Sequence, residues 1–374
     1  MDRPVTVAVF VSPHGFGHAA RACAVMQALA DLEPSVRFEV FTLVPEWFFR
    51  DSLACRFRWR RLLTDVGLAQ ATPLVEDLDA TLAQLSTFLP FSDAALDDVA
   101  RVVSDTECAL VIADISPLGI AAARRAGVPS VLIENFTWDW IYERYLGTHP
   151  AFRVPIEALA PLFAAADLRL QTEPVCRTVA GGLTVAPVSR APRSPRDQTR
   201  SRLGVDAGTA LVLVTMGGVP WRHTALDALE TSSDAVFVVP GASEAVERRG
   251  SLLALPNRSG FFHPDLVAAS DAVVGKLGYS TLAECYGAGV PFAYATRGTF
   301  RESGPLAVFV ADRMRGMALA PEDVERGTWP AVVPALLALR RLGGARENGA
   351  TAAARLLLGR LRTRTAGAPG PRPV

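Results

Sequence analysis

Short apolar runs alternate with amphipathic stretches of helical length along the first half of the chain. In order, these segments are Val5–Val11, His18–Leu29, Arg37–Leu43, Ala109–Ala113, Gly119–Arg125 and Ser130–Ile133. Apolar runs that are separated by helices are typical of parallel strands in a sheet covered on both faces. We therefore expect an α/β domain in this half.

The same alternation starts again after residue 200. Its segments are Ala210–Thr215, Thr224–Leu229, Ala235–Val239, Leu252–Leu255, Ala272–Val274, a helix from Thr281, and Phe292–Ala295. Between the halves, Ala186–Arg202 is rich in proline and arginine and has no apolar period, which indicates an exposed linker. The predicted organisation is a domain over 1–185, a linker over 186–202, a second domain over 203–330, helices over 331–362 and a disordered tail over 363–374.

The segment Arg56–Arg61 alternates aromatic residues with arginines at a period of two. Such a period is that of a strand, here with Phe57 and Trp59 facing inward and the arginines outward. A membrane-surface patch is the alternative, because arginines interleaved with aromatic residues also suit anionic lipids. We favour the strand, since no amphipathic helix is evident.

Composition narrows the class of protein. Of 374 residues, 50% are hydrophobic and 20% are charged, which is typical of globular proteins. The 38 basic and 38 acidic residues balance, so nucleic acid is not an expected partner. No apolar run reaches the roughly 18 residues of a membrane span, and Val5–Val11 lacks the basic leader of a signal peptide. We expect a cytoplasmic protein without a transmembrane segment.

Cysteine and lysine usage adds two points. The 5 cysteines lie far apart and form no C-x-x-C motif, so neither a disulfide framework nor a zinc site is predicted. Lys276 is the sole lysine of the chain. Either chance or a requirement for an ammonium group at that position accounts for it.

The loop after the first strand is a candidate for a binding or catalytic site, because ligands of open α/β sheets bind beyond the carboxyl ends of the strands. Gly15 and Gly17 allow a tight turn close to a ligand. His14 and His18 are either polar loop residues, or at least one of them is an acid/base group. Gly15-x-Gly17-x-x-Ala20 also matches the dinucleotide-binding fingerprint, although that match is weak alone.

Two later loops of the first half offer further candidates. Asp114 follows a strand and either caps the next helix or orients a histidine on a neighbouring loop. Glu134 and Trp138 open an aromatic-rich segment that either lines an acceptor pocket or packs against the sheet. Asp77-Leu-Asp79 has the form of a metal-binding D-x-D, but it lies in a helix-like stretch and no metal site is predicted there.

The second half of the sequence gives a stronger indication of a phosphate-binding site. Lys276 and Gly278 follow a strand, and a helix is expected to start at Ser280 or Thr281, so that amides and an ammonium group meet an anion. Glu284, one turn further on, either accepts hydrogen bonds from ribose hydroxyls or closes a capping box with Thr281. The chain has no G-x4-G-K-[ST] sequence, which excludes a P-loop NTPase.

Five segments along the chain, in the same order, carry a family resemblance. They are HGFGHAAR (14–21), ADISPLGIAAARRAG (113–127), ENFTWDWIYERY (134–145), FFHPDLVAASDAVVGKLGYSTLAE (261–284) and VPF (290–292). Together they resemble the GT-B glycosyltransferase superfamily. They are most similar to the glycosyltransferase-like N-terminal region of L-arabinokinases and its stand-alone bacterial relatives. The sugar-kinase domain of arabinokinases has no counterpart here, so phosphorylation of a sugar by that domain is not expected.

The resemblance implies roles for individual residues. In the second domain, the glycine loop that approaches the donor corresponds to Gly217 and Gly218, and the segment that contacts the base corresponds to Phe262 and His263. The phosphate-facing turn corresponds to Lys276, Gly278, Ser280 and Thr281, the ribose-binding carboxylate to Glu284, and a group that binds donor-sugar hydroxyls to Glu302. The first domain faces the acceptor, and its first loop, His14–His18, often supplies the base.

These arguments predict an α/β protein of GT-B type, with two Rossmann-like domains whose parallel sheets face each other across a cleft. The predicted enzyme is a metal-independent glycosyltransferase that needs no cofactor. It moves a sugar from a nucleoside-diphosphate donor to a small-molecule or glycoconjugate acceptor, with His18 as the base and Asp114 holding its tautomer; His14 is the second choice. The alternatives are a non-catalytic nucleotide-sugar-binding protein, a nucleotide-sugar epimerase or hydrolase, and a Rossmann oxidoreductase.

Overall fold

The apolar runs of the first half form one sheet in a computed structural model that describes residues 4–72, 74–216, 225–344 and 346–367. Its strand order is β3-β2-β1-β6-β7-β8-β9, and every adjacent pair is parallel. The strands are β1 (Thr6–Val11), β2 (Arg37–Thr42), β3 (Phe57–Arg61), β6 (Cys108–Asp114), β7 (Ser130–Glu134), β8 (Leu168–Thr172) and β9 (Leu183–Val185). The order reverses between β1 and β6, where such sheets bind ligands beyond their carboxyl ends.

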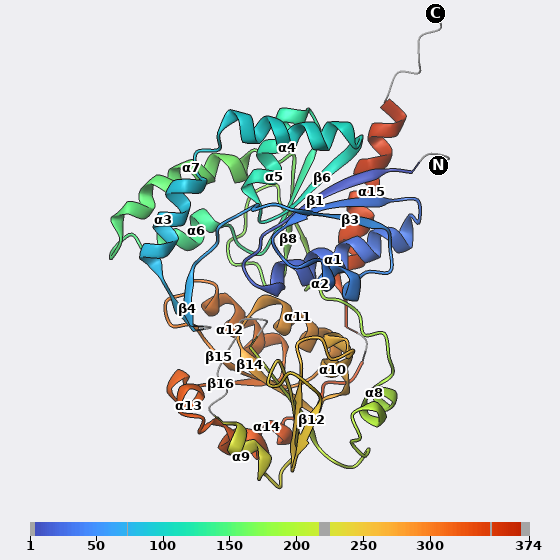
Figure 1. The fold of residues 1–374 in the computed structure, drawn as a ribbon, viewed down its shortest axis with the longest axis vertical. Helices are drawn as coiled ribbons and strands as arrows, with labels where there is room; N and C mark the ends of the chain where they lie inside the picture. Colours follow the sequence, from blue (N-terminus) through green and yellow to red (C-terminus); the bar gives the residue numbers. More distant parts are fainter. Residues whose placement is uncertain (1–3, 73, 217–224, 345, 368–374) are drawn as a thin grey trace, which may run out of the picture.

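Helices cover both faces of this sheet (Figure 1). They are α1 (Phe16–Leu32), α2 (Glu46–Ser52), α3 (Leu78–Phe88), α4 (Asp93–Asp105), α5 (Pro117–Ala126), α6 (Trp138–Glu143), η1 (Pro150–Phe152) and α7 (Arg153–Ala164). Asp77 accepts a hydrogen bond from the Ala80 amide and so caps α3. The first aspartate of the D-x-D sequence therefore has a structural role.

The last helix of the chain returns to the first domain. Helix α15 (Gly349–Gly367) packs beside α1, where Ala353, Ala354 and Leu357 are fully buried in the same cluster as β1 and β2 (Figure 1). The helix continues to Gly367, so the disordered tail predicted from residue 363 begins too early; alanine and arginine, which favour helices, extend it. Residues 368–374 lie outside the described part of the chain.

The second half forms a sheet of order β12-β13-β11-β10-β14-β15-β16, in which all pairs are parallel except β12 with β13. The strands are β10 (Leu211–Thr215), β11 (Val236–Pro240), β12 (Glu247–Arg249), β13 (Leu252–Leu255), β14 (Ala272–Lys276), β15 (Phe292–Ala295) and β16 (Gly316–Leu319). The helices are α9 (Leu226–Glu230), α10 (His263–Ala269), α11 (Tyr279–Ala288), α12 (Ser303–Arg313), α13 (Pro321–Arg326), η2 (Trp329–Val332) and α14 (Val333–Ala338). The order reverses between β10 and β14, which places the loop after β14 at the switch point.

A hairpin of the first domain reaches the second one. Strands β4 (Gln70–Thr72) and β5 (Val75–Glu76) form an antiparallel pair that projects toward the second domain (Figure 1). The Thr299 hydroxyl donates to Glu76 Oε2 at 2.7 Å, and Leu74 packs against the core of the second domain. The hairpin therefore connects the domains in addition to the linker.

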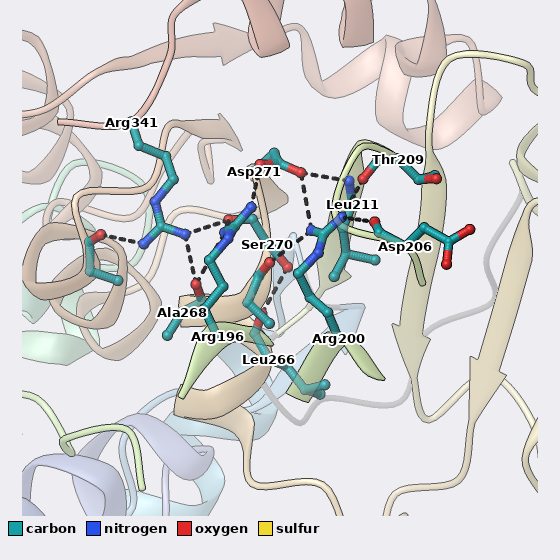
Figure 2. A network of polar contacts seen from close by, with 12 residues as sticks. Arg196, Arg200, Asp206, Thr209, Leu211, Leu266, Ala268, Ser270, Asp271 and Arg341 are labelled. Carbon is teal, nitrogen blue, oxygen red and sulfur yellow. Dashed lines mark hydrogen bonds and ion pairs between the residues drawn. The ribbon is translucent and has the colours of Figure 1, made fainter. Parts of the chain in front are cut away.

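The predicted linker is partly helical. Its second half forms α8 (Arg196–Arg202), and Arg200 within it is buried, so the prediction of an exposed linker over 186–202 is wrong for this residue. The reason is a network around Asp271 that the local sequence does not reveal (Figure 2). Arg196 and Arg200 pair with the two oxygens of Asp271, and Arg341 joins Arg196 at the carbonyls of Ala268 and Ser270.

Replacing Asp271 with alanine is expected to lower the free energy of unfolding by about 2 kcal/mol, because a buried Arg200 loses its counter-ion and the Leu211 amide loses its acceptor. Urea unfolding followed by circular dichroism measures this loss. Asp271→Asn keeps an acceptor for the amide and should lose less. Equal losses in the two variants would assign the whole effect to the charge, which both remove, whereas an unchanged stability of Asp271→Asn would contradict a role for the charge.

The arginine-rich segment is the edge strand β3, parallel to β2, which confirms the predicted strand. Phe57 and Trp59 pack against the core of the first domain, and Arg60 pairs with Glu39. Within the described ranges, no helix combines the length and the apolar character that crossing a membrane requires.

Candidate active site

A histidine–carboxylate pair lies at the switch point of the first sheet. His18, in the first turn of α1, places Nδ1 3.0 Å from Asp114 Oδ1 at the end of β6. Because an ionised carboxylate can only accept, Nδ1 carries the proton and Nε2 is left as an acceptor. The pair confirms the predicted contact, whereas the neighbouring Ser116 takes the alternative role of capping the next helix.

The backbone conformation next to His18 and Asp114 sets the direction of their side chains. Gly15 precedes α1 with φ 73° and ψ −175°, a conformation that glycine alone adopts readily, and the helix starts directly after it. Ile115 follows Asp114 with φ 51°, in the left-handed region. This conformation is strained for a β-branched residue, and such strain is found where a side chain must be held in a set direction.

Arg21, one turn after His18 on α1, fixes the carboxylate. Its Nε and Nη2 donate to the two oxygens of Asp114 at 2.9 and 2.7 Å, and both side chains are almost fully buried. Burial opposes the charge of Asp114, but Arg21 and His18 outweigh it and hold the pKa of that carboxyl below its ordinary value. Asp114 is therefore ionised at neutral pH, as an orienting partner of His18 must be.

The network continues into the second domain. Arg21 Nη1 donates to Asn135 Oδ1 at 2.8 Å, and Asn135 Nδ2 donates to Glu302 Oε1 at 2.7 Å. Arg21 also lies over the ring of Tyr279 at the start of α11, 5.0 Å from its centre. The predicted base and the predicted sugar-binding carboxylate Glu302 are thus joined through three side chains, those of Asp114, Arg21 and Asn135.

His14 has a different hydrogen-bonding state from His18. The Leu68 amide donates to His14 Nδ1 at 3.3 Å, so Nδ1 is an acceptor and the proton of the neutral ring is on Nε2. Burial and the nearby charge of Arg297 hold the pKa of His14 well below its ordinary 6.5. At neutral pH this ring offers a hydrogen-bond donor from Nε2, which disfavours it as the base.

A small cavity between the domains brings most of these groups together. Its volume is about 70 Å³, which leaves room for a few water molecules. The lining residues from the first domain are His14, Gly15, Phe16, Gly17, His18, Arg21, Gln70, Asn135 and Phe136, and those from the second are Lys276, Gly278, Tyr279, Ser280, Thr281, Arg297, Phe300 and Glu302. A sugar ring needs more space, so the domains must separate here to admit one.

Lys276 projects from the end of β14 into this small cavity. Among the described residues, no side chain or carbonyl makes a hydrogen bond or ion pair with its ammonium group. Burial, together with the positive charge of Arg297, lowers the pKa of Lys276 from 10.5 to about 7. The group therefore gains or loses its charge in the physiological range and is available to an anion.

A larger cavity of about 970 Å³ lies on the other side of Ser280 and Thr281, which line both spaces. Phe262, His263 and Glu284, the residues predicted to contact the base and the ribose, line it from the second domain. A volume of this size is typical of ligand sites. The two cavities share one helix N-terminus.

Glu284 is more constrained than predicted. Arg190 donates to Glu284 Oε1 at 2.9 Å, and His263 Nδ1 lies 2.7 Å from Oε2. Burial opposes ionisation, but Arg190 and His263 outweigh it and lower the pKa of Glu284. Oε1 also accepts from Arg190 Nε at 3.2 Å, but Oε2 keeps a second lone pair, so Glu284 can still accept from a ribose hydroxyl.

The alternative role for Thr281 and Glu284, a capping box, is not found in the structure. Helix α11 begins at Tyr279, two residues before Thr281, with Gly278 at the N-cap and no side-chain cap. Glu284 instead binds Arg190 and His263. The first amides of α11, which have no partner within the helix, are consequently left for a ligand.

Two of the predicted residues, Glu134 and Trp138, line neither cavity. Glu134 pairs with Arg169 and Gln171 of β8 and lines neither cavity. Trp138 is fully buried in the core; its ring lies 5.0 Å from that of His14 and so positions it. Gly217 and Gly218 lie outside the described residues.

Several residues of the site were not predicted as functional: Arg21, Asn135, Arg190 and Arg297. Arg21 lies within the resemblance segment 14–21, and its spacing of three from His18 on one helix is the available signal. Arg190 was assigned to an exposed linker and gives no local signal. Within the described residues, no group of three or more His, Cys, Asp or Glu side chains could hold a metal ion.

Comparison with known proteins supports the sequence resemblance. No family model matches the chain. L-arabinokinase from Arabidopsis thaliana is 28% identical over 365 residues, which cover 95% of this chain and 34% of that protein. An uncharacterized glycosyltransferase from Methanopyrus kandleri is 27% identical over 237 residues, covering 60% of this chain and 67% of that protein. The chain thus spans about a third of the length of L-arabinokinase.

Solved structures have the same fold. A UDP-glucosyltransferase from Polygonum tinctorium, capable of glucosylating indoxyl, superposes with a TM-score of 0.62 at 13% identity, covering 96% of this chain and 99% of that one. With two α/β domains that face each other across a cavity of ligand size, the chain has the GT-B fold of glycosyltransferases. Its sequence is similar to that of L-arabinokinase, in agreement with the resemblance found from the sequence.

Proposed function

We propose that the chain transfers a sugar from a nucleoside-diphosphate donor to an acceptor nucleophile, with His18 as the general base and without a metal ion. The observation that carries the proposal is the His18–Asp114 pair at the small cavity, directly beside the larger cavity that suits a nucleotide. His18 Nε2 accepts the acceptor's proton as the bond to the sugar forms, and Asp114 stabilises the imidazolium.

The start of α11 supports the donor side of the proposal. Ser280 and Thr281 line both cavities, so a diphosphate at this point has its nucleoside in the larger cavity and its sugar in the smaller one. The free amides of α11 and the ammonium group of Lys276 stabilise the charge that develops on the departing diphosphate. His14 Nε2 donates a further hydrogen bond into the small cavity.

A binding screen tests the donor assignment. Calorimetry and thermal shift with UDP, dTDP, GDP and ADP should single out at least one ligand, and a ligand at 100 times its Kd stabilises the fold by about 2.7 kcal/mol. The donor sugar of the selected nucleotide is then incubated with candidate acceptors, and the released nucleoside diphosphate is measured. Failure of every nucleoside diphosphate to bind would reject the proposal.

Affinity for the selected nucleoside diphosphate is expected to fall about tenfold between pH 7 and pH 8.5. Below a pKa of about 7 Lys276 is protonated and attracts the diphosphate, and above it the free protein loses this charge. Calorimetric titrations across this range measure the change. An affinity that stays constant over the range would remove Lys276 from the donor site.

Lys276→Met is the matched control for the pH dependence. The variant should bind the nucleotide more weakly at pH 7 and show little change with pH. Without ligand it should be more stable than the wild type by a few kcal/mol near neutral pH, because the cost of a buried charge is gone. This gain should shrink as the pH rises toward 10.5, the ordinary pKa of lysine, where the unfolded chain also loses the proton.

A further inference from the structure

Arg297 is a buried cation whose donors are not all used. It follows β15, is only 5% exposed and lines the small cavity. Its Nε and Nη1 have no hydrogen-bond partner among the described residues, although its guanidinium lies against the ring of Phe300. Leaving such donors unpaired is costly, so their retention next to a cavity indicates a ligand that accepts from them.

The lining of the small cavity carries more positive than negative charge. Arg21, Lys276 and Arg297 line it, and Glu302 is the only acid among the described lining residues. Glu302 Oε1 is taken by Asn135, and Oε2 lies 3.9 Å from Arg297 Nη2, too far for a hydrogen bond. Arg21 is neutralised by Asp114. Lys276 and Arg297 therefore share one carboxylate.

Glu76 of the β4–β5 hairpin is the other acid near these cations. It acts electrostatically on both Lys276 and Arg297. It does not line the cavity, its Oε2 accepts from Thr299, and it forms no ion pair within 4.0 Å with either cation. Gln70 of the same hairpin presents a further buried donor, Nε2, that has no partner among the described residues. The unpaired groups that line the cavity are thus hydrogen-bond donors.

The diphosphate of the donor does not account for Arg297. The larger cavity meets the smaller one at Ser280 and Thr281. Lys276 and Arg297 both line only the smaller one, but Lys276 ends β14 directly before α11, whereas Arg297 follows the next strand, β15. Arg297 comes from the loop after β15, on the far side of Lys276 from β10, because β14 lies between β10 and β15. A group that reaches Arg297 belongs to the part of the ligand that occupies the small cavity, which is the sugar.

We propose that Arg297, together with Gln70, binds a carboxylate on the transferred sugar, so that the preferred donor is a nucleoside-diphosphate uronic acid. This inference rests on the proposed function of the same site. A planar guanidinium offers paired donors along two of its edges, Nε with Nη2 and Nη1 with Nη2, and either pair matches the two oxygens of a carboxylate. A neutral hexose presents one uncharged hydroxyl oxygen in place of the carboxylate and cannot accept from such a pair at two oxygens, and that difference sets the specificity.

The experiment compares two donors that differ only in the carboxylate. UDP-glucuronic acid and UDP-glucose are titrated against the full chain by calorimetry, with the galacto pair in parallel and UDP alone as reference; another nucleotide replaces uridine if the screen selects it. The uronic acid is expected to bind about ten to a hundred times more tightly than the neutral sugar. Equal affinities, with UDP still bound, would overturn this inference and leave the proposed function standing.

Arg297→Met then assigns the preference to its residue. The variant is expected to bind the acidic and neutral donors with equal affinity. The matched control is Arg301→Met, which removes an arginine of the same loop that contacts Trp140 and Glu143 and lines neither cavity. Its preference for the uronic acid should equal that of the wild type.

Two outcomes of the Arg297 experiment count against the inference. If Arg297→Met keeps the preference, the carboxylate binds elsewhere. If the variant weakens UDP and UDP-glucuronic acid by the same factor, Arg297 serves the diphosphate. Should Arg297→Met fail to fold, Arg297→Lys, which keeps the charge and loses the paired donors, is expected to show a reduced preference. Absence of binding by UDP and every other nucleoside diphosphate rejects the proposed function itself.

Discussion

Replacing His18 with alanine is expected to lower kcat by about a hundredfold or more, the usual scale for loss of a general base. The reason is geometric: Nδ1 is held by Asp114, and Nε2 is the acceptor at the small cavity. Donor affinity should change little, because the proposed nucleotide site is formed mainly by the second domain. Steady-state assays of nucleoside-diphosphate release, together with calorimetry of the variant, measure both quantities.

His14→Ala is the comparison for this result. Since His14 Nδ1 accepts from the Leu68 amide, the variant loses a donor but no base, and its kcat should fall less than that of His18→Ala. Near-normal turnover in His18→Ala with loss of turnover in His14→Ala would assign the base to His14.

Asp114→Ala is expected to destabilise the fold by about 3–5 kcal/mol, the range for removing one partner of a buried ion pair. The variant leaves the Arg21 guanidinium, which is 1% exposed, without its counter-ion. The full decrease in the free energy of unfolding should be observed at neutral pH, where Asp114 of the wild type is ionised. It should shrink as the pH falls below 3.8, the ordinary pKa of the carboxyl, because the unfolded wild-type chain then takes up a proton at Asp114, whereas the folded protein, in which this pKa is lower, remains ionised. Urea unfolding at pH 7 and at pH 3 measures both values.

The double variant Asp114→Leu with Arg21→Met provides the control. Removing both charges and filling the space with apolar side chains should recover most of the stability, since the desolvation cost of the pair is also removed. Activity should not recover, because His18 has lost its partner. A loss below about 1 kcal/mol in Asp114→Ala would indicate that Asn135 and Thr172 compensate Arg21 on their own.

The sequence was sufficient to predict the strands, because a buried parallel strand is a short apolar run whatever surrounds it. It also predicted the Asp114–His18 contact, since β1 and β6 are neighbours and both residues follow their carboxyl ends. Lys276 was predicted from its uniqueness and its glycine loop. Each of these signals is local or follows from a single topological rule.

The residues whose roles were predicted wrongly or missed depend on which way a side chain points and on partners that are distant in the sequence. Glu134 is the last residue of β7 and is paired with Gln171 across the sheet, whereas Asn135, one residue later, bridges to Glu302. Side chains alternate between faces along a strand, so an error of one residue changes the neighbours completely. Arg190 is in the site because Glu284, 94 positions away, accepts from it, and no local pattern encodes such a pair.

The return of α15 to the first domain has a consequence for biosynthesis. Domains usually fold in the order in which they are translated. Here the first domain receives part of its core, including Ala353 and Leu357, from a helix translated after the whole second domain. The nascent first domain therefore exposes the apolar surface of α1 until translation of α15, and the second domain, although later in the sequence, is the first whose core can be completed.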